Sequence, residues 1–242
     1  MLAAGEAGRV AAVPDGATLV LEDGLVVRLA GLAVPGSAAD PQPAAAAREA
    51  LADLALGRRV ELRYSGPRRD RHGRARAHVF RVGRDGEPAL WLQRALVEAG
   101  RGRFASAADD RACLVPLAAA ERAARSAGSG LWHVPDYHIR AARDSSLLQQ
   151  EGLYELVEGR VLSIGRAGRR IYLNFGRRWT SDFTAEIEAQ AEDAFAAAGV
   201  PVETLEGRIV RVRGWIEEHG GPLVRITHPE QIEILDEADG GN

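Results

Sequence analysis

Residues Val13 to Gly36 read VPDGATLVLEDGLVVRLAGLAVPG, and this stretch predicts more of the fold than any other part of the chain. Leucine and β-branched residues flank an acidic-glycine turn, Glu22-Asp23-Gly24. Because hairpin turns favour Asp-Gly, the pattern predicts two strands, Ala17 to Leu21 and Leu25 to Leu29. We therefore expect a β-hairpin here, after a first strand that starts over Gly8 to Val13.

The hairpin carries two motifs, DGxT at its beginning and VRLxGLxxP at its end. Together they resemble the opening of the staphylococcal-nuclease, or thermonuclease-like, family, in which the motifs are closer to DGDT and RLxGIDxPE. The later segments ALVEAG and AERAARSAGSGLW also resemble family segments, so the resemblance covers roughly residues 8–135. It implies a five-stranded barrel of the OB type with added helices.

The resemblance also shows which family residues are missing. Asp15 and Thr18 remain from DGDT, but Ala17 stands where the family has a metal-binding Asp, and Ala33 and Gly36 replace the later acids. Ca²⁺ takes six to eight oxygen ligands, and an alanine methyl supplies none. Lewis-acid chemistry and a general base worth roughly 10²–10⁴-fold would both be lost. We therefore expect no catalytic set, no metal site and no cofactor, with Ca²⁺ relevant only if other carboxylates have taken over.

The cationic half of the family pattern is retained. Arg28 comes from VRL, and Arg74 lies in DRHGRA, which matches the family's DxxGR motif. The resemblance implies that these two guanidinium groups hold a phosphate. Arg71 and His72, next to Arg74, are further candidates for ligand contact, although an exposed loop position explains His72 equally well.

Other carboxylates lie close enough in sequence to be considered as replacements for the lost acids. They are Glu22, Asp23, Asp40 and Glu49, and nothing in their spacing predicts that they converge.

Composition describes a globular protein with unevenly distributed charge. The net charge is −3, and all 31 basic residues are arginine. Residues 58–84 hold ten arginines against two acids, and residues 185–206 hold six acids and no base. One part of the molecule could therefore attract nucleic acid while another repels it, although arginines on alternating strand positions also fit a solvated face.

The single Cys113 excludes an intramolecular disulfide, and its neighbour Leu114 favours a buried position. No apolar run approaches 18 residues, so we expect no membrane span. The N-terminal MLAAGEAGRV does not have the pattern of a signal peptide. Family relatives are often exported, so the localisation stays open.

Within the first half, turn and helix signals divide the chain into alternating elements. Gly57 and Gly100 are placed to end two of the helices. After the hairpin we predict helices over Ala44–Leu56, Ala89–Ala99 and Pro116–Ala127, and strands over Arg59–Tyr64 and Arg74–Val82.

The second half repeats this kind of pattern after a polar stretch, residues 136–151, which we interpret as a linker. YLNFG, DFT, VRGWI and HPEQIE resemble an OB-type module that accompanies nuclease-like domains in some bacterial proteins. We predict a β-rich α+β chain of two tandem OB-type five-stranded barrels, with a nuclease-like domain over 6–135 and an OB-fold domain over 152–236. The expected elements of the second domain are strands over Leu153–Ile164, Arg170–Phe175, Phe183–Ile187, Gly207–Ile216 and Leu223–Ile226, and a helix over Gln190–Ala198.

OB folds bind single-stranded nucleic acid with stacking aromatics and cations on strands 2 and 3. Arg170 and Tyr172 share one face of the predicted second strand, and Phe175 shares the opposite, inward face. Arg211 lies on the predicted fourth strand. Arg170, Tyr172 and Arg211 are therefore candidates for ligand binding.

Three functions remain open from the sequence. The first is a catalytically inactive, nuclease-like protein that binds nucleic acid or another phosphate-bearing ligand. The second is an active metal-dependent phosphodiesterase with rearranged acids. The third is a protein-interaction scaffold whose arginines meet an acidic partner.

Overall fold

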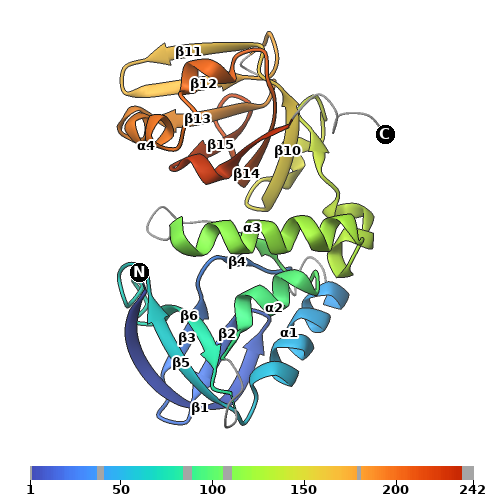
Figure 1. Cartoon of the computed structure of the whole chain (residues 1–242). Helices are drawn as coiled ribbons and strands as arrows, with labels where there is room; N and C mark the ends of the chain where they lie inside the picture. The colour runs from blue at the N-terminus through green and yellow to red at the C-terminus, as the bar shows by residue number, and fades with distance from the viewer. Residues whose placement is uncertain (1, 37–40, 84–88, 106–110, 179–180, 236–242) are drawn as a thin grey trace. The chain divides into compact units, whose positions relative to one another are not determined.

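The computed structural model describes residues 2–36, 41–83, 89–105, 111–178 and 181–235, and Figure 1 shows the chain as a ribbon. The chain divides into two compact units, Met1–Asp136 and Tyr137–Asn242. Each unit contains its own hydrophobic core. The described residues are rich in β-strands and include four α-helices, which places the structure in the α+β class.

The first unit is built on a closed five-stranded barrel. β1 pairs with both β2 and β5, β2 pairs with β3, and β5 pairs with β6. A parallel pair of β3 and β6 then closes the ring, so the barrel has no open strand edge. The strands are β1 (Ala3–Asp15), β2 (Thr18–Leu21), β3 (Val26–Leu29), β5 (Arg59–Tyr64) and β6 (Ala75–Arg81).

The hairpin predicted from Val13 to Gly36 is confirmed as β2 and β3, and its turn glycine Gly24 has a φ of 85°. Strand β1 is longer than expected, because it begins at Ala3 and pairs with β5 along its first half and β2 along its second. In β5, Val60, Leu62 and Tyr64 are buried and alternate with outward polar residues. This alternation is the pattern by which RVELRY was recognised as a strand.

Helices pack against this barrel, the first on β1 and the middle one on β6. The predicted first helix is confirmed as α1 (Pro41–Ala55), which begins earlier than expected, and α3 (Arg111–Ser126) likewise begins before Pro116. The middle helix, α2 (Leu92–Glu98), is shorter than predicted, because Leu90–Trp91 forms β7 and pairs with β6. A further short pair joins β4 (Leu32–Ala33) to β8 (Arg103–Phe104).

Gln93 anchors α2 to the barrel. Its side-chain amide is fully buried, donates to the carbonyls of Ala30 and Ala77 at 3.2 and 2.9 Å, and accepts from the Val79 N–H at 3.1 Å. These bonds satisfy backbone groups where β6 leaves its regular pairing.

The second unit is built on a curled β-sheet. Its main strands are β10 (Tyr154–Arg160), β11 (Ser163–Ala167), β12 (Arg170–Asn174), β13 (Thr184–Glu188), β14 (Ile209–Glu218) and β15 (Pro222–Ile226). The path runs β11-β12-β13-β15-β14-β10, and two short strands, β9 (Arg140–Ala141) and β16 (Ile232–Leu235), pair with β10 and β14. The predicted single strand over Leu153–Ile164 is interrupted between β10 and β11. The predicted helix over Gln190–Ala198 is shortened to a 3-10 turn followed by α4 (Glu192–Ala197).

The two units share one strand order. In each, the first strand pairs with the second and fourth, the third pairs with the fifth in parallel, and a helix connects the third to the fourth. In the second unit, β10 and β11 together take the place of the first strand. Both arrangements are compatible with OB-type barrels.

A local bonding pattern repeats at the same place in both units. In Gly8-Arg9-Val10, Arg9 Nη1 donates to the Gly57 carbonyl at 2.6 Å. In Gly159-Arg160-Val161, Arg160 Nη1 donates to the Gly207 carbonyl at 2.5 Å.

The backbone around each of these glycines repeats as well. In both units the backbone N–H of the valine donates to the backbone carbonyl of the arginine that follows the glycine. The glycine N–H donates in turn to the valine carbonyl. The four bonds are Val10 to Arg58 at 2.9 Å, Gly57 to Val10 at 2.9 Å, Val161 to Arg208 at 3.0 Å and Gly207 to Val161 at 2.9 Å.

The segment 136–151, interpreted as a linker, contains regular structure. β9 pairs with β10, a 3-10 turn covers Leu147–Gln150, and Leu147 is buried in the second core. Its polar composition concealed this, because one inward leucine and two paired residues are enough to attach it to the sheet. No helix in the described ranges is both long and apolar enough to cross a bilayer.

Candidate functional site

The turn between β1 and β2 is held together by Asp15. Its Oδ1 accepts the Ala17 N–H at 2.7 Å and its Oδ2 accepts the Thr18 hydroxyl at 2.9 Å. This is the turn chemistry for which Asp is favoured. The Asp15 carboxylate therefore has a structural role in this turn.

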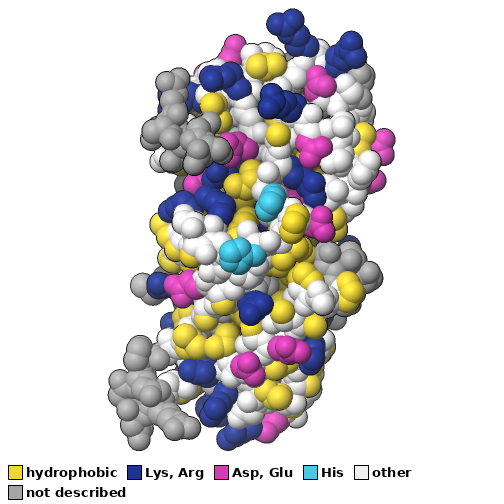
Figure 2. Space-filling model, turned by 90° about the vertical axis from the view of Figure 1, so that its right-hand side faces the viewer, with side chains coloured by type: hydrophobic (Ala, Val, Ile, Leu, Met, Phe, Trp, Pro, Cys, Tyr) yellow, Lys and Arg dark blue, Asp and Glu magenta, His cyan; other side chains and the backbone are white. Residues whose placement is uncertain are grey.

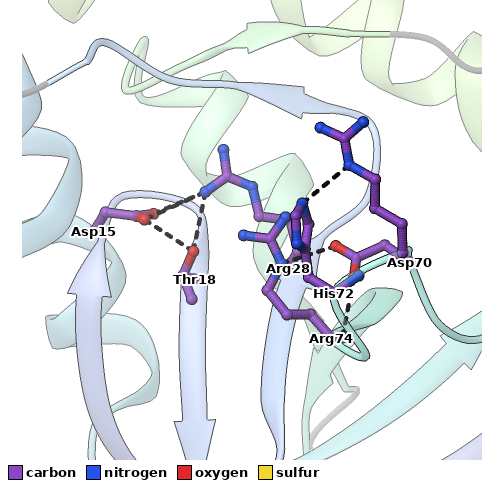
Figure 3. Close-up of polar contacts among 7 residues, drawn as sticks. Asp15, Thr18, Arg28, Asp70, His72 and Arg74 are labelled. Carbon is purple, nitrogen blue, oxygen red and sulfur yellow. Dashed lines mark hydrogen bonds and ion pairs between the residues drawn. The ribbon is translucent and has the colours of Figure 1, made fainter.

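Arg28 points at the same turn from the neighbouring strand. It is the cross-strand partner of Thr18, and its Nη1 lies 3.3 Å from both Asp15 oxygens and 3.0 Å from the Thr18 hydroxyl. Figure 3 shows the three side chains converging. The Arg28 and Asp15 side chains are 36% and 50% exposed, and exposed ion pairs of this kind contribute only about 0–1 kcal/mol.

A pocket of about 410 Å³ opens beside this pair. Asp15, Gly16 and Arg28 line one side, and Arg48 on α1 lines another. Gly16 brings the turn and α1 together, because a Cβ at this position would lie 2.6 Å from the Cβ of Ala47. The pocket volume is within the range of small-ligand sites, roughly 300–1,000 Å³.

Arg48 is the site residue that sequence reasoning missed. It is exposed, and within the described part of the chain it forms no hydrogen bond or ion pair. An isolated arginine on an alanine-rich helix gives no motif, so only the packing of α1 against the turn could reveal it.

The start of α1 also faces the pocket. Pro41, Ala44 and Ala45 line it, and the first turn of α1 contains no acidic residue. The N-terminus of a helix carries partial positive charge, which favours an anion, but Pro41 and Pro43 have no N–H to donate, so the first turn of α1 offers an anion fewer hydrogen bonds than an ordinary helix start.

Positions 17, 33 and 36, which hold Ala, Ala and Gly, supply no metal ligand. Ala17 is fully buried in the core, Ala33 lies in β4, and Gly36 lines the pocket without a side chain. No group of three or more His, Cys, Asp or Glu side chains suitable for a metal occurs within the described ranges. Among the pocket's described lining residues, Asp15 is the single carboxylate, which does not fit a calcium ion's need for several oxygens.

The other carboxylates considered from the sequence lie elsewhere. Glu22 and Asp23 form the β2–β3 turn, at the opposite end of the hairpin from Asp15. Glu49 does not line the pocket, and Asp40 lies outside the described residues.

Arg74 is held by its own loop. Asp70 accepts the backbone N–H groups of His72 and Arg74 at 2.8 and 3.0 Å and the Arg74 Nε at 2.8 Å. Burial acts to raise the pKa of Asp70, but the bonds from Arg74 and from the two backbone N–H groups outweigh it and lower that pKa to about 2. Gly73, with a φ of 75°, allows the tight turn.

The Asp70 loop lies near Arg28 through the parallel pairing of β3 and β6, in which Val27 is opposite Ala75. Arg71 Nε donates to His72 Nε2 at 3.0 Å, and both side chains are exposed. Arg71, His72 and Arg74 do not line the pocket. The structure thus places Arg28 and Arg48 at the pocket. Arg74 lies on the neighbouring loop beside Asp70 (Figure 3).

In the second unit, two of the three candidate residues lie together on the sheet face. Arg170 is exposed, and its Nη1 lies 3.4 Å from Glu186, a carboxylate only 1% exposed that also contacts Arg225. Tyr172 is half-buried and stands opposite Glu186 on β13. The buried Glu186 carboxylate therefore offsets part of the positive charge of Arg170 and Arg225 on this face.

Arg211 occupies a different environment from the exposed one expected of a ligand contact. It is 9% exposed and forms ion pairs with Glu158 at 2.9 Å and Glu233 at 2.8 Å, which tie β14 to β10 and β16. Phe175 packs against the second core, as predicted for an inward residue.

The visible surface carries charges of both signs. On the face in Figure 2, basic side chains are interspersed with acidic ones. Of the ten arginines in 58–84, Arg63, Arg69 and Arg74 pair with acids, and Arg84 lies outside the described residues. No protein-family model matches the chain, and no curated protein matches it significantly.

Proposed function

We propose that the first unit binds a phosphate group of single-stranded nucleic acid in the Arg28–Arg48 pocket and does not hydrolyse it. One observation carries the proposal: two guanidinium groups and the start of α1 meet at a pocket whose described lining contains a single carboxylate. Planar guanidinium groups match phosphate oxygens in two-bond geometry. One carboxylate engaged in a turn supplies neither a metal site nor a free base.

Binding would exchange one anion for another. Asp15 contacts Arg28 at 3.3 Å in a half-exposed pair, so displacing it costs little. Arg48 has no described partner to lose. A phosphate between the two arginines would gain charge-assisted hydrogen bonds that the unliganded pocket lacks.

A polyanion is favoured over an isolated phosphate because further cations follow the same strands. Arg76 is the cross-strand partner of Arg28 on β6, is exposed, and forms no described side-chain contact. Arg71 lies on the preceding loop. A single strand leaving the pocket could follow these residues with its backbone.

The test is binding of a labelled single-stranded DNA by fluorescence anisotropy between about 50 and 200 mM salt. Arg28→Gln and Arg48→Gln should each weaken binding and reduce the logarithmic salt slope by about one. Arg58→Gln is the matched control, because Arg58 is exposed, has no described side-chain contact and follows the opposite end of α1. Equal effects of all three, or binding that ignores salt, would refute the proposal.

Hydrolysis is tested on the same sample by adding Ca²⁺, Mg²⁺ or Mn²⁺ and following the length of the DNA and of a matching RNA. Intact strands are expected. Cleavage that disappears in Asp15→Ala would establish the phosphodiesterase alternative. A pull-down with the full chain that recovers a stoichiometric protein and no nucleic acid would favour the interaction scaffold.

A further inference from the structure

A second pocket, of about 440 Å³, lies entirely within the second unit, where β10 gives way to β11. The sheet path ends at β9 on one side and β11 on the other, so the curled sheet has a seam here. Leu162, in the break between β10 and β11, lines the pocket and is 46% exposed. A leucine this exposed at a concave site marks apolar surface available to a ligand.

The floor of this seam pocket is apolar. Phe175 crosses Gly159 so closely that a Cβ on the glycine would lie 3.0 Å from the ring and 2.6 Å from the Cβ of Ala142. Ile209, at the start of β14, adds to the floor. Gly159 therefore permits the aromatic ring to line the cavity.

The rim of the seam pocket is cationic. Arg143 lines it, is exposed, and forms no hydrogen bond or ion pair within the described ranges. Arg160 uses Nη1 for the Gly207 carbonyl and retains its remaining N–H donors. Among the described lining residues Glu158 is the single acid, and it is ion-paired at 2.9 Å with Arg211, which also pairs with Glu233.

We propose that the seam pocket binds a small amphipathic carboxylate, with its hydrocarbon part on Phe175 and Leu162 and its carboxylate at Arg143. The carboxylate would satisfy an unpaired guanidinium, and the hydrocarbon would cover apolar surface. A nucleobase fits less well, because its edge needs neutral donors and acceptors, and this pocket offers apolar groups and charges. The proposal is independent of the nucleic-acid site in the first unit.

Octanoate is the probe, titrated calorimetrically into the full chain, with octanol as the uncharged counterpart. Octanoate should bind more tightly than octanol. Arg143→Gln should weaken octanoate about tenfold, the range of one charge-assisted bond, and leave octanol unchanged. Leu162→Gln should weaken both.

Arg169→Gln is the control, because Arg169 is an exposed arginine of the same unit that does not line the pocket. Absence of octanoate binding, or equal affinities of Arg143→Gln and Arg169→Gln, would overturn the proposal. Displacement of octanoate by single-stranded DNA in a variant carrying both Arg28→Gln and Arg48→Gln would also overturn it, by assigning the pocket to nucleic acid.

Discussion

At the scale of single residues, Glu6 shows how this chain immobilises its arginine-rich loop. The Tyr64 hydroxyl donates to Glu6 at 2.6 Å, and Arg69 donates to the same carboxylate at 2.6 Å and to the Tyr64 oxygen at 3.0 Å. The hydrogen bond from Tyr64, which has the larger effect, and the bond from Arg69 lower the pKa of Glu6 from 4.5 to about 2. The three groups connect β1, β5 and the loop before β6.

The lowered pKa of Glu6 predicts acid sensitivity. A carboxylate whose folded pKa lies below its unfolded value contributes stability above pH 4.5, and that contribution is lost as pH falls toward 2. Tyr64→Phe removes one donor, so the pKa of Glu6 should rise, and the free energy of unfolding should depend less on pH between about 5 and 2. Carboxyl titration by NMR measures the shift.

Tyr172→Phe is the control for this change, because the Tyr172 hydroxyl makes no described hydrogen bond. A Glu6 pKa that stays near 2 in Tyr64→Phe would show that Arg69 alone controls it.

Asp15→Asn separates a binding site from a catalytic one. Asparagine keeps an acceptor for the Ala17 N–H, so the turn should survive, while the charge that competes for Arg28 disappears. We therefore expect single-stranded DNA to bind several-fold more tightly. Affinity that is unchanged or weaker in this variant would show that Asp15 does not compete with the ligand.

At the scale of elements, the hydrogen bonds of the two Gly-Arg-Val segments fix the point at which the chain leaves a helical segment and enters the next strand. Gly57 and Gly207 follow the connecting helix region of each unit, with φ angles of 68° and 78°. Both can return the chain because glycine adopts this left-handed conformation without a Cβ penalty. The arginine then binds the freed glycine carbonyl, which satisfies an exposed helix-end acceptor.

Alanine at either glycine should destabilise its own unit. At both positions a Cβ meets no atom within 4 Å, so the cost is backbone strain alone, roughly 1–2 kcal/mol. Gly57→Ala and Gly207→Ala should lower the free energy of unfolding similarly in chemical denaturation. Gly36→Ala, in open space without a positive φ, should not. A loss at Gly36 equal to the others would contradict the strain explanation.

At the scale of the whole molecule, two separate cores support two compact units. Leu62 belongs to the first core and Leu173 to the second, and both side chains are almost completely buried. The pocket holding Arg28 depends on the first core, and the seam pocket depends on the second.

Truncating each core should therefore affect one unit. Leu62→Ala and Leu173→Ala should each cost about 2–5 kcal/mol, because a cavity replaces buried methyl groups. Hydrogen exchange should accelerate across β1 to β6 in the first variant and across β10 to β15 in the second. Acceleration across both units from either change would show that the chain unfolds as one cooperative body.

Local sequence determined the elements of this protein. The Glu22-Asp23-Gly24 turn, the alternation in RVELRY and the glycines after the helices act through neighbouring residues, so the hairpin, the regular strands and the C-terminal ends of the helices could be predicted, whereas the helix starts could not. The resemblance grouped Asp15, Thr18 and Arg28, and the short-range pairing of β2 with β3 places Thr18 opposite Arg28.

Tertiary structure alone decided which residues from distant parts of the chain contact one another. The sequence did not predict that Arg48 would reach the pocket, that Arg211 would be enclosed by Glu158 and Glu233, or that segment 136–151 would join a sheet. These contacts join residues far apart in the chain, and their formation depends on barrel closure and helix packing. Such long-range contacts leave no periodic or motif signal in the sequence.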